Sequence, residues 1–302
     1  MPDEACPASP EQRQDGHSAM PDGLVLVSTP IGNLGDLTPR ARETLLAADL
    51  ILCEDTRHTA GLLAAIGAKV RLQPLHEHNE DAAIPSVLVQ LRRGRRIALV
   101  SDAGVPLVSD PGYRLVRAAL AEGLAVGAVP GANAAITALV LSGLPPLPFL
   151  MLGFPPPRQA ARRAAFSRIR GAERAGLAAT LIWYEAPHRL AETLADMAEA
   201  FGDRAAAVAR ELTKRFEEVR RGTLSGLAAH YAKTAARGEV TVVAGPPEQD
   251  DPENLDGRLR AALAANSVKD AAALVATATG LPRKLVYTRA LALSDSANQQ
   301  DP

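Results

Sequence analysis

Short runs of apolar residues alternate with longer amphipathic stretches along most of this chain. An apolar run of about four to eight residues is typical of a buried strand, and an apolar position every third or fourth residue is typical of a helix packed on a sheet. Helical stretches separate the runs, so we expect a mostly parallel sheet whose loops gather along one edge. In the first half the predicted strands are Gly23–Ser28, Leu50–Cys53, Ile97–Val100 and Leu124–Val129.

The alternation of strands and helices restarts after the proline-rich segment Leu144–Pro148, in which neither a helix nor a strand can continue. Helical patterns follow at Arg158–Arg174 and Pro187–Ala200. This second series of elements predicts a second α/β domain. Its predicted strands are Phe149–Phe154, Ala179–Tyr184, Ala205–Ala209 and Glu239–Ala244.

The predicted organisation is therefore of the α/β class, with two α/β domains at residues 23–145 and 146–247. A small helical module follows at 257–292, after an acidic linker at 248–256 that contains a proline. The segment 1–22 holds proline, glutamine and acidic residues with almost no apolar ones, so we expect a disordered tail there. We expect a second disordered tail at 293–302.

Several helix ends carry local signals. Thr38 is expected to cap a helix that begins with Pro39, and the next helix is expected to stop at Gly67. In the terminal module, Ser267-Val-Lys-Asp270 fits a capping box, and its helix is expected to end at Gly280. The second helix of that module carries Arg283, Lys284, Tyr287 and Arg289.

The composition limits the classes of partner. Lys plus Arg number 33 and Asp plus Glu number 34, which gives a net charge of −1, so any RNA contact has to come from a local basic patch. Aromatic residues make up only 3% of the chain, so the stacking platforms of single-strand binders are not expected. The two cysteines exclude a disulfide framework, and no apolar run approaches the ~20 residues of a membrane helix. We expect a soluble, cytoplasmic protein that does not enter a membrane.

The segment Ser101–Gly112, Ser-Asp-Ala-Gly-Val-Pro-Leu-Val-Ser-Asp-Pro-Gly, is the first candidate for a binding loop. It lies between a predicted strand and a predicted helix, and ligands of open α/β sheets bind at the carboxyl ends of strands. Its two carboxylates, Asp102 and Asp110, suit the recognition of hydroxyl or ammonium groups better than that of phosphate. Alternatively, Asp110 caps the following helix.

Glu54 and Asp55 form a second pair of carboxylates, which could orient or deprotonate a hydroxyl group. Alternatively, Asp55 pairs with Arg57 or caps the helix that begins there. His76 and His78 have a spacing that puts them on one face of a strand, but no third metal ligand follows at a typical distance. Hydrogen bonding within the loop is the better interpretation of these histidines, so we predict no metal site.

The loop Thr29–Asp36, after the first predicted strand, contains glycines at positions 32 and 35. Such glycines could form a phosphate cradle. However, the loop has no Gly-Lys-Ser/Thr ending, and the Gly-x-Gly-x-x-Gly spacing of dinucleotide-binding loops is absent. We therefore exclude nucleotide hydrolysis.

The segment 158–174 holds six arginines and a single acid, Glu173. A solvated helix face would look similar. The net excess of six minus one, or five, positive charges favours contact with a polyanion, and the guanidinium group matches phosphate geometry best. The arginines are Arg158, Arg162, Arg163, Arg168, Arg170 and Arg174.

Six motifs occur together and in order along the chain. Together they closely resemble the ribosomal RNA small-subunit methyltransferase I family of the tetrapyrrole-methylase superfamily. The resemblance covers about Gly23 to Gly245, and the C-terminal helical module also looks like that of the same family. The motifs are Thr29–Asp36, Glu54–His58, His76–Glu80, Ser101–Gly112, Tyr184–Leu190 and Ala209–Lys214.

The resemblance implies an enzyme that methylates the ribose 2′-hydroxyl of a cytidine in 16S rRNA, in the decoding region of the small ribosomal subunit. It also implies two α/β domains with S-adenosylmethionine in the cleft between them, and a homodimer. Asn133 departs from the family's pattern, because many relatives have a small hydroxyl residue or a proline near this position. Carried over by position, the residues expected to bind the cofactor are Ser101, Asp102, Val105, Asn133, Ala134, Tyr184 and Leu212.

Methyl transfer to a ribose hydroxyl is an in-line displacement at carbon, so it requires positioning and benefits from a nearby proton acceptor. We predict Glu54, Asp55 and Glu185 as catalytic residues. The residues predicted to bind the RNA substrate are Asn33, Arg57, His188, Arg189 and Lys214. Alternatively, the segment 185–189 is a capped helix start at a domain interface.

Two other functions fit part of the sequence. A methyltransferase of the same fold could act on a tetrapyrrole or on diphthine, but it would leave the basic segment and the terminal module unexplained. A non-enzymatic RNA-binding assembly factor would explain the arginines, but it would leave Ser101–Gly112 without a purpose. Binding of S-adenosylmethionine distinguishes either enzyme from the assembly factor.

Overall fold

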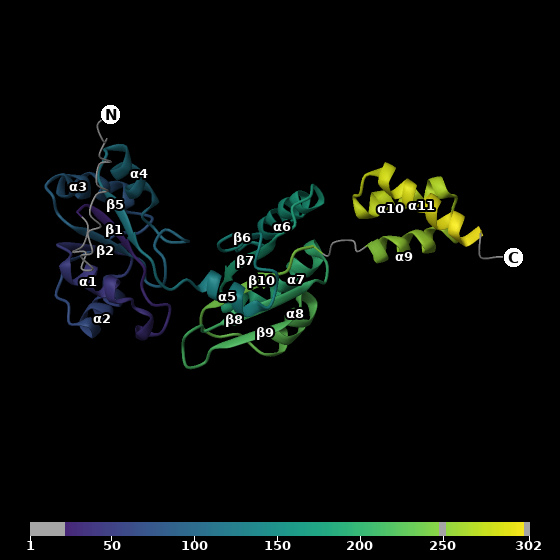
Figure 1. Cartoon of the computed structure of the whole chain (residues 1–302). Helices are drawn as coiled ribbons and strands as arrows, with labels where there is room; N and C mark the ends of the chain where they lie inside the picture. The colour runs from purple at the N-terminus through teal and green to yellow at the C-terminus, as the bar shows by residue number, and fades with distance from the viewer. Residues whose placement is uncertain (1–21, 248–251, 299–302) are drawn as a thin grey trace, which may run out of the picture. The chain divides into compact units, whose positions relative to one another are not determined.

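The computed structural model describes residues 22–247 and 252–298 and divides into two compact units (Figure 1). The first unit ends with Asn133 and the second begins with Ala134. Helix α5 (Ala134–Ser142) packs against strands of the second sheet, so the division falls before this helix. The predicted boundary at residues 145–146 comes after α5, because the prolines that suggested it follow the end of this helix inside the second unit.

The first unit is built on a five-stranded sheet in which every pairing is parallel, as predicted. The order across the sheet is β3-β2-β4-β1-β5. All four residues of β2 and of β4 are buried, because helices cover both faces of the sheet. The strands are β1 (Leu24–Val27), β2 (Leu50–Cys53), β3 (Leu72–Pro74), β4 (Ile97–Val100) and β5 (Val126–Val129).

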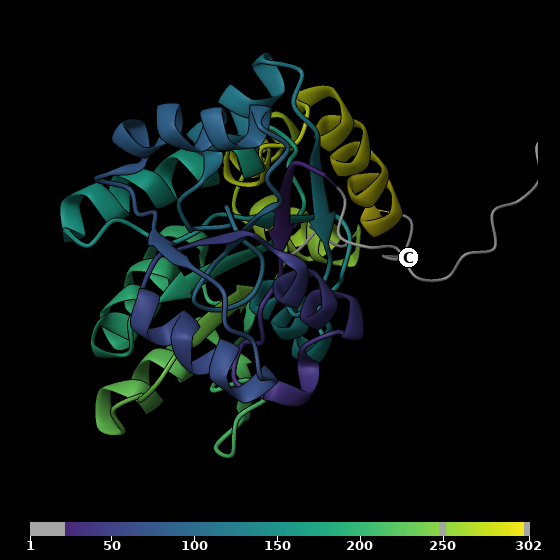
Figure 2. The same cartoon turned by 90° about the vertical axis from the view of Figure 1, so that its left-hand side faces the viewer.

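The helices of this unit lie on the two faces of its sheet (Figure 1, Figure 2). Successive strand residues point to opposite faces, so Val25 and Ile51 pack with α1 and α2, whereas Leu24 and Leu50 pack with α3 and α4. The helices are η1 (Leu34–Asp36), α1 (Pro39–Ala47), α2 (Thr56–Ile66), α3 (Glu80–Arg92) and α4 (Tyr113–Ala121).

The predicted signals at the ends of α1 and α2 are confirmed. Pro39 is the first residue of α1, and the Thr38 hydroxyl accepts a hydrogen bond from the Ala41 amide at 3.1 Å. Helix α2 ends at Gly67, whose φ of 74° is easily adopted only without a side chain.

The second unit contains a mixed five-stranded sheet in the order β6-β7-β10-β8-β9. Strands β6 and β7 pair in parallel, and the other pairs are antiparallel. Strand β9, with the sequence Glu-Val-Arg-Arg-Gly-Thr, was not predicted, because a largely polar edge strand lacks the apolar alternation of a core strand. The strands are β6 (Phe149–Met151), β7 (Thr180–Glu185), β8 (Ala205–Arg210), β9 (Glu218–Thr223) and β10 (Val240–Ala244).

Three aromatic rings meet in the core of the second unit. Phe166, Trp183 and Phe201 contact one another, with ring centroids 5.4 to 5.8 Å apart. This arrangement joins α6 and α7 to the middle of the sheet. The helices are α5 (Ala134–Ser142), α6 (Gln159–Arg174), η2 (Pro187–Arg189), α7 (Leu190–Phe201) and α8 (Leu224–Lys233).

Three further helices form the C-terminal module: α9 (Pro252–Leu263), α10 (Val268–Thr279) and α11 (Arg283–Asn298). They pack against one another around an apolar core. The Ser267 hydroxyl caps α10 by accepting from the Asp270 amide at 3.2 Å, and α10 ends at Gly280, as predicted. In a capping box the Asp270 carboxylate would accept a hydrogen bond from the Ser267 backbone amide. Here it accepts from the Ser267 hydroxyl instead.

The ends of this module differ from the predicted ranges. Helix α9 begins inside the predicted linker, because Pro252 suits the first position of a helix. Helix α11 continues to Asn298, into the predicted tail. The rest of the predicted linker and tails, at residues 1–21, 248–251 and 299–302, lies outside the described residues.

Candidate functional site

The carboxyl ends of β1, β2, β4 and β5 lie along one edge of the first sheet, because these strands run parallel. The chain leaves this edge at Ser28, Glu54, Ser101 and Pro130. The site residues predicted for this unit follow these strand ends. The topology therefore gathers four segments that are far apart in the sequence.

The loop Ser101–Gly112 is tied to the loop after β1. Thr29 and Gly104 exchange two backbone hydrogen bonds, at 2.9 and 3.2 Å, and the Thr29 hydroxyl donates to the Ser101 carbonyl at 3.1 Å. The Ser101 hydroxyl donates to the Gly104 carbonyl at 3.1 Å. Leu107 and Ser109 have φ values of 72° and 70°, a strained conformation that persists only where the surrounding structure imposes it. The loop is therefore held in one conformation.

Three carboxylates, those of Glu54, Asp102 and Asp110, interact at this edge. Burial raises the pKa of Asp110 to about 7, and the charges of Glu54 and Asp102 add to the shift. Burial also raises the pKa of Glu54, again with help from Asp102. Asp102 accepts a hydrogen bond from the Asp55 amide at 3.2 Å. The cluster is electrostatically suited to a ligand that carries positive charge or donates hydrogen bonds.

The alternative interpretation of Asp110 as a helix cap is wrong. Helix α4 begins after Gly112, which has a φ of 117°, and no side chain caps it. A Cβ atom at Gly112 would lie 2.5 Å from the Leu99 side chain, so the backbone here requires glycine. Asp110 is instead the partly buried member of the carboxylate cluster.

The substitution Asp110→Asn is expected to stabilise the protein at pH 8. The folded pKa of about 7 lies above the usual 3.8, so the wild-type protein loses stability as pH rises from 3.8 to 7, whereas the amide does not titrate. Because Asp110 is partly exposed, the free energy of unfolding of Asp110→Asn at pH 8 should exceed that of the wild type by roughly 1–2 kcal/mol. In thermal unfolding between pH 5 and 8, the melting temperature of Asp110→Asn should exceed that of the wild type by a margin that grows up to pH 7 and then levels off. An advantage independent of pH would contradict this account, and Asp36→Asn, at an exposed carboxylate, serves as the control.

Asp55 caps helix α2 and pairs with Arg57, so both alternatives left open for it are confirmed. Its carboxylate accepts from the Arg57 amide at 2.8 Å and from the Arg57 guanidinium at 3.1 and 2.7 Å. The hydrogen bond from the Arg57 side chain lowers the pKa of Asp55 to about 2. Asn33 similarly caps η1, where its side chain accepts from the Gly35 amide at 2.9 Å. Both residues therefore have local structural roles at this edge.

The histidines after β3 lie in a turn and not on a strand, because β3 ends at Pro74. The backbone amide of His76 donates to the Asn79 side chain at 2.8 Å, so a hydrogen bond within the loop is present but does not involve the imidazole ring. The Nδ1 atom of His76 is buried and has no hydrogen-bond partner. Within residues 22–247 and 252–298, no group of three or more His, Cys, Asp or Glu side chains is arranged to hold a metal ion.

The second unit also gathers predicted residues at one sheet edge. Strands β7 and β8 both run antiparallel to β10, which lies between them, and Val240 of β10 pairs with Glu185 on one side and Arg210 on the other. The chain therefore leaves β7 and β8 at the same edge. Leu212 is buried there, and the Tyr184 ring lies 5.5 Å from that of Phe154.

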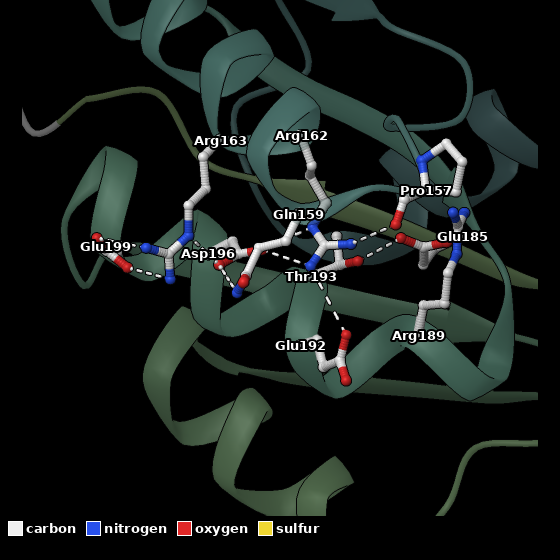
Figure 3. Close-up of polar contacts among 10 residues, drawn as sticks. All are labelled: Pro157, Gln159, Arg162, Arg163, Glu185, Arg189, Glu192, Thr193, Asp196 and Glu199. Atoms are coloured by element: carbon white, nitrogen blue, oxygen red, sulfur yellow. Dashed lines mark hydrogen bonds and ion pairs between the residues drawn. The ribbon is translucent and has the colours of Figure 1, made fainter.

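Glu185 is enclosed, and both of its carboxylate oxygens are occupied (Figure 3). One accepts from the Ala186 amide at 2.7 Å and from the Arg189 guanidinium at 2.5 Å, and the other accepts from the Thr193 hydroxyl at 2.5 Å. These contacts hold the turn η2, which contains His188 and Arg189. The segment is thus a helix start fixed by Glu185, although no side chain caps η2 or α7 as the alternative interpretation expects.

Lys214 is held in the loop after β8. Its ammonium group donates to the carboxylates of Glu211 and Glu239, each at 3.0 Å. Burial alone would lower the pKa of Lys214, but these two hydrogen bonds outweigh it and raise the pKa above its ordinary value. Lys214 is therefore a fixed cation, and its charge is largely balanced within the unit.

The predicted basic segment 158–174 consists of Arg158 and the helix α6 that follows it, and three of the six arginines of the segment are engaged in ion pairs. The Arg162 and Arg163 guanidinium groups donate to opposite oxygens of Asp196 at 2.7 and 2.8 Å. Arg170 pairs with Glu173. The prediction of polyanion contact is wrong for Arg162, whose side chain is only 1% exposed. The arginines that stay exposed without an ion pair to a described residue are Arg158, Arg168 and Arg174.

Asp110, which the sequence predicts as one of the two carboxylates of the binding loop, interacts in the structure with Glu54, one of the predicted catalytic residues. The position of Asp110 in the predicted binding loop is visible in the sequence. Its interaction with Glu54, which follows a different strand, is not. The predicted cofactor residues Asn133 and Ala134 fall on opposite sides of the division between the units. Val105 lies half-buried in the tied loop.

Comparison with known proteins identifies the family. The family described as Tetrapyrrole (Corrin/Porphyrin) Methylases matches residues 23–228, and the RsmI C-terminal HTH domain matches residues 248–294. The chain is 45% identical to the ribosomal RNA small subunit methyltransferase I of Mesorhizobium japonicum, over 92% of this chain and 94% of that protein. It is 47% identical to the protein of the same name from Xylella fastidiosa, over 88% of this chain and 98% of that protein.

Solved structures show the same fold. The methyltransferase CobJ has a TM-score of 0.55 and 20% identity, over 74% of this chain and 94% of that chain. A diphthine synthase has a TM-score of 0.55 and 15% identity, over 74% of this chain and 90% of that chain.

The chain belongs to the tetrapyrrole methylase family, whose fold combines the two α/β units described above. Within it, the identity to curated relatives over about nine-tenths of the chain places it in the ribosomal RNA small subunit methyltransferase I family. The resemblance carried by the six motifs is thus confirmed. Across the described residues, none of the helices is both long enough and apolar enough to cross a membrane.

Proposed function

We propose that this protein transfers a methyl group from S-adenosylmethionine to the ribose 2′-hydroxyl of a cytidine in 16S rRNA of the small ribosomal subunit. The names of the relatives from Mesorhizobium japonicum and Xylella fastidiosa support a small-subunit rRNA substrate. The observation that carries the proposal is the carboxylate cluster of Glu54, Asp102 and Asp110 at the edge of the first sheet. A cationic methyl donor with an amine and ribose hydroxyls matches this cluster in charge and in hydrogen-bonding capacity.

The cofactor, when bound, supplies an electrophilic methyl group on a positively charged sulfur. The tied loop Ser101–Gly112 offers a fixed backbone and the Asp102 carboxylate for this ligand, so its residues fit the role. In the second unit, the loops after β7 and β8 leave the same sheet edge and present Tyr184 and Leu212. The residues assigned to the cofactor are Ser101, Asp102, Val105, Asn133, Ala134, Tyr184 and Leu212.

Of the three carboxylates predicted as catalytic, we assign Glu54 as the proton acceptor. Glu54 is an exposed residue, partial desolvation and the Asp102 charge raise the pKa of its carboxylate, and this carboxylate makes no hydrogen bond or ion pair with another described residue. Glu54 would accept the proton of the ribose 2′-hydroxyl, and the donor, when bound, would supply the methyl group. Asp55 and Glu185 have their oxygens occupied by other side chains, so we assign them to positioning.

We assign contacts with RNA to residues near these two sheet edges. Arg57 is highly exposed beside Glu54, and Arg189 is held by Glu185. Guanidinium groups in fixed positions suit phosphate oxygens. The full set is Asn33, Arg57, His188, Arg189 and Lys214.

The test uses the purified protein, S-adenosylmethionine with a labelled methyl group, and small subunits from a strain that lacks this gene. The expected result is label in 16S rRNA, located as one cytidine ribose methyl by mass spectrometry of nuclease digests. Saturable binding of the donor without label in RNA would contradict the RNA substrate and favour a tetrapyrrole or diphthine substrate. Absence of donor binding would contradict a methyltransferase and favour an RNA-binding assembly factor. Sedimentation of the purified protein alone tests the homodimer that the family resemblance implies.

A further inference from the structure

The loop between β8 and β9 exposes an aromatic ring beside an arginine. Phe216 is 65% exposed, the largest exposed fraction among the aromatic side chains of the described residues. The guanidinium carbon of Arg215 lies 5.5 Å from the centroid of the Phe216 ring, within the range of a cation–π contact. Neither residue is among those predicted from the sequence to bind RNA.

The backbone of this loop is fixed by its own hydrogen bonds. The Lys214 amide donates to the Glu211 carbonyl at 3.0 Å, and the Glu217 amide donates to the Lys214 carbonyl at 3.1 Å. The Thr213 amide donates to the Glu217 carboxylate at 2.6 Å. Glu211 and Thr213 have φ values of 50° and 64°, which residues with side chains adopt only where the structure imposes them.

The base of the loop is fixed by the Glu211 carboxylate. It accepts from the Lys214 ammonium at 3.0 Å and from the Glu239 amide at 3.1 Å, and the hydrogen bond from Lys214 lowers its pKa. Gly238 makes room for this carboxylate, because a Cβ atom there would lie 2.0 Å from its oxygen. The loop therefore presents Phe216 with little conformational freedom left to lose on binding.

The free charge beside Phe216 is positive. Lys214 is paired with Glu211 and Glu239, and Glu217 accepts from the Thr213 amide. Arg215 makes no ion pair with a described residue. A guanidinium group without a carboxylate partner suits a phosphate, and a ring that is open on one side suits a flat aromatic partner.

We propose that Phe216 and Arg215 bind an unpaired nucleotide of the RNA substrate, with the Phe216 ring stacked on the base and Arg215 on a neighbouring phosphate. This inference rests on the proposed function and adds a contact to the same substrate. Bases inside a duplex offer no free face to a side chain, whereas bases of loops and single strands do. A protein partner would instead require a broader apolar surface than one ring among charged side chains.

The chain offers a matched control in the first unit. Tyr113 is 60% exposed, and the Arg117 guanidinium lies 5.7 Å from its ring centroid. Tyr113 begins α4, directly after the loop that contains Asp102 and Asp110, so its neighbouring loop carries carboxylates where the loop of Phe216 has an arginine without an ion pair to a described residue. The two aromatic–arginine pairs are therefore alike in geometry and differ in their electrostatic surroundings.

The test places a fluorophore at each position by the substitutions Phe216→Trp and Tyr113→Trp. The only native tryptophan, Trp183, is buried and contributes a constant background. Titration with an unpaired oligoribonucleotide copied from the small-subunit RNA should quench Phe216→Trp saturably, because a stacked base quenches indole fluorescence. The same strand annealed into a duplex should quench it far less, and Tyr113→Trp should not respond. Equal responses to both strands, or a response at Tyr113→Trp alone, would overturn the proposal.

Two further variants measure the contribution of each side chain. Phe216→Ala should weaken binding of the unpaired RNA about 5- to 150-fold, as for loss of one stacked base, and Phe216→Tyr should restore it. Arg215→Ala should reduce the slope of log affinity against log salt concentration by about 0.7, the value for one phosphate contact on a single strand. The Kd of S-adenosylmethionine should not change in either variant.

These results separate the inference from the proposed function. If the wild-type protein methylates small-subunit RNA and Phe216→Ala binds RNA as tightly as wild type, the stacking contact is wrong and the function stands. If the wild-type protein transfers no methyl group to RNA but Phe216→Trp is quenched by the unpaired strand, the function is wrong and the contact stands.

Discussion

Replacing Glu54 by glutamine is expected to lower kcat for methyl transfer to RNA by about 100-fold or more, the usual contribution of a positioned proton acceptor. The amide keeps the size of the side chain but cannot take the hydroxyl proton. Burial raises the pKa of Glu54, so wild-type kcat should fall as pH decreases through this raised pKa, where the carboxyl becomes protonated. Glu54→Gln should lack this acidic limb. Single-turnover transfer of labelled methyl to small subunits, measured from pH 5 to 9, provides both readouts.

A matched control for Glu54→Gln is Glu77→Gln, which removes an exposed carboxylate in the turn after β3 of the same unit. It should keep kcat within about twofold of wild type, as expected for a surface substitution. If Glu54→Gln retains the wild-type rate and acidic limb, Glu54 is not the proton acceptor. The positioning residue Asp55 would then be the next carboxylate to examine, despite its low pKa.

The substitution Asp196→Ala is expected to lower the free energy of unfolding of the second unit by about 3–5 kcal/mol. Asp196 and Arg162 are each 1% exposed, and the two side chains form a buried ion pair that joins α6 to α7 (Figure 3). Removal of the carboxylate would leave the buried Arg162 charge with only the exposed Glu192 carboxylate, 3.8 Å away. Urea unfolding followed by Trp183 fluorescence reports on this unit, because Trp183 lies in its core and the chain has no other tryptophan.

The control for Asp196→Ala is Glu199→Ala. Glu199 is 62% exposed and pairs with the partly exposed Arg163 at 2.7 Å, so its loss should cost at most about 1 kcal/mol. Equal losses in the free energy of unfolding of the two variants would show that burial of the pair between Arg162 and Asp196 adds no stability. Burial alone would raise the pKa of Asp196, but hydrogen bonds from Arg163 and Arg162 hold it below its usual 3.8 in the folded protein. The destabilising effect of Asp196→Ala should therefore shrink as pH falls below about 5, because the unfolded wild-type chain takes up a proton at Asp196 before the folded protein does.

Much of the secondary structure was predictable because its signals are local. The runs Leu50–Cys53 and Ile97–Val100 are strands because every side chain in them is buried, and an unbroken apolar run records that burial directly. Thr38 and Gly67 mark helix ends through their own hydrogen bonds and backbone conformation. Strand β9 was missed because an edge strand owes its existence to pairing with β8, which its own polar sequence does not record.

The amino-acid sequence by itself determined the parallel sheet of the first unit, the restart of the α/β pattern, the family, and the motifs that follow the strand ends. These features depend on periodicity and on residues within a few positions of one another. Only the tertiary structure decided which charged groups meet. It put Asp110 beside Glu54, occupied both oxygens of Glu185, and buried Arg162 against Asp196. The charge of a side chain follows from the residue type alone. Its partner depends on strand order and helix packing, which bring together residues that are far apart along the chain.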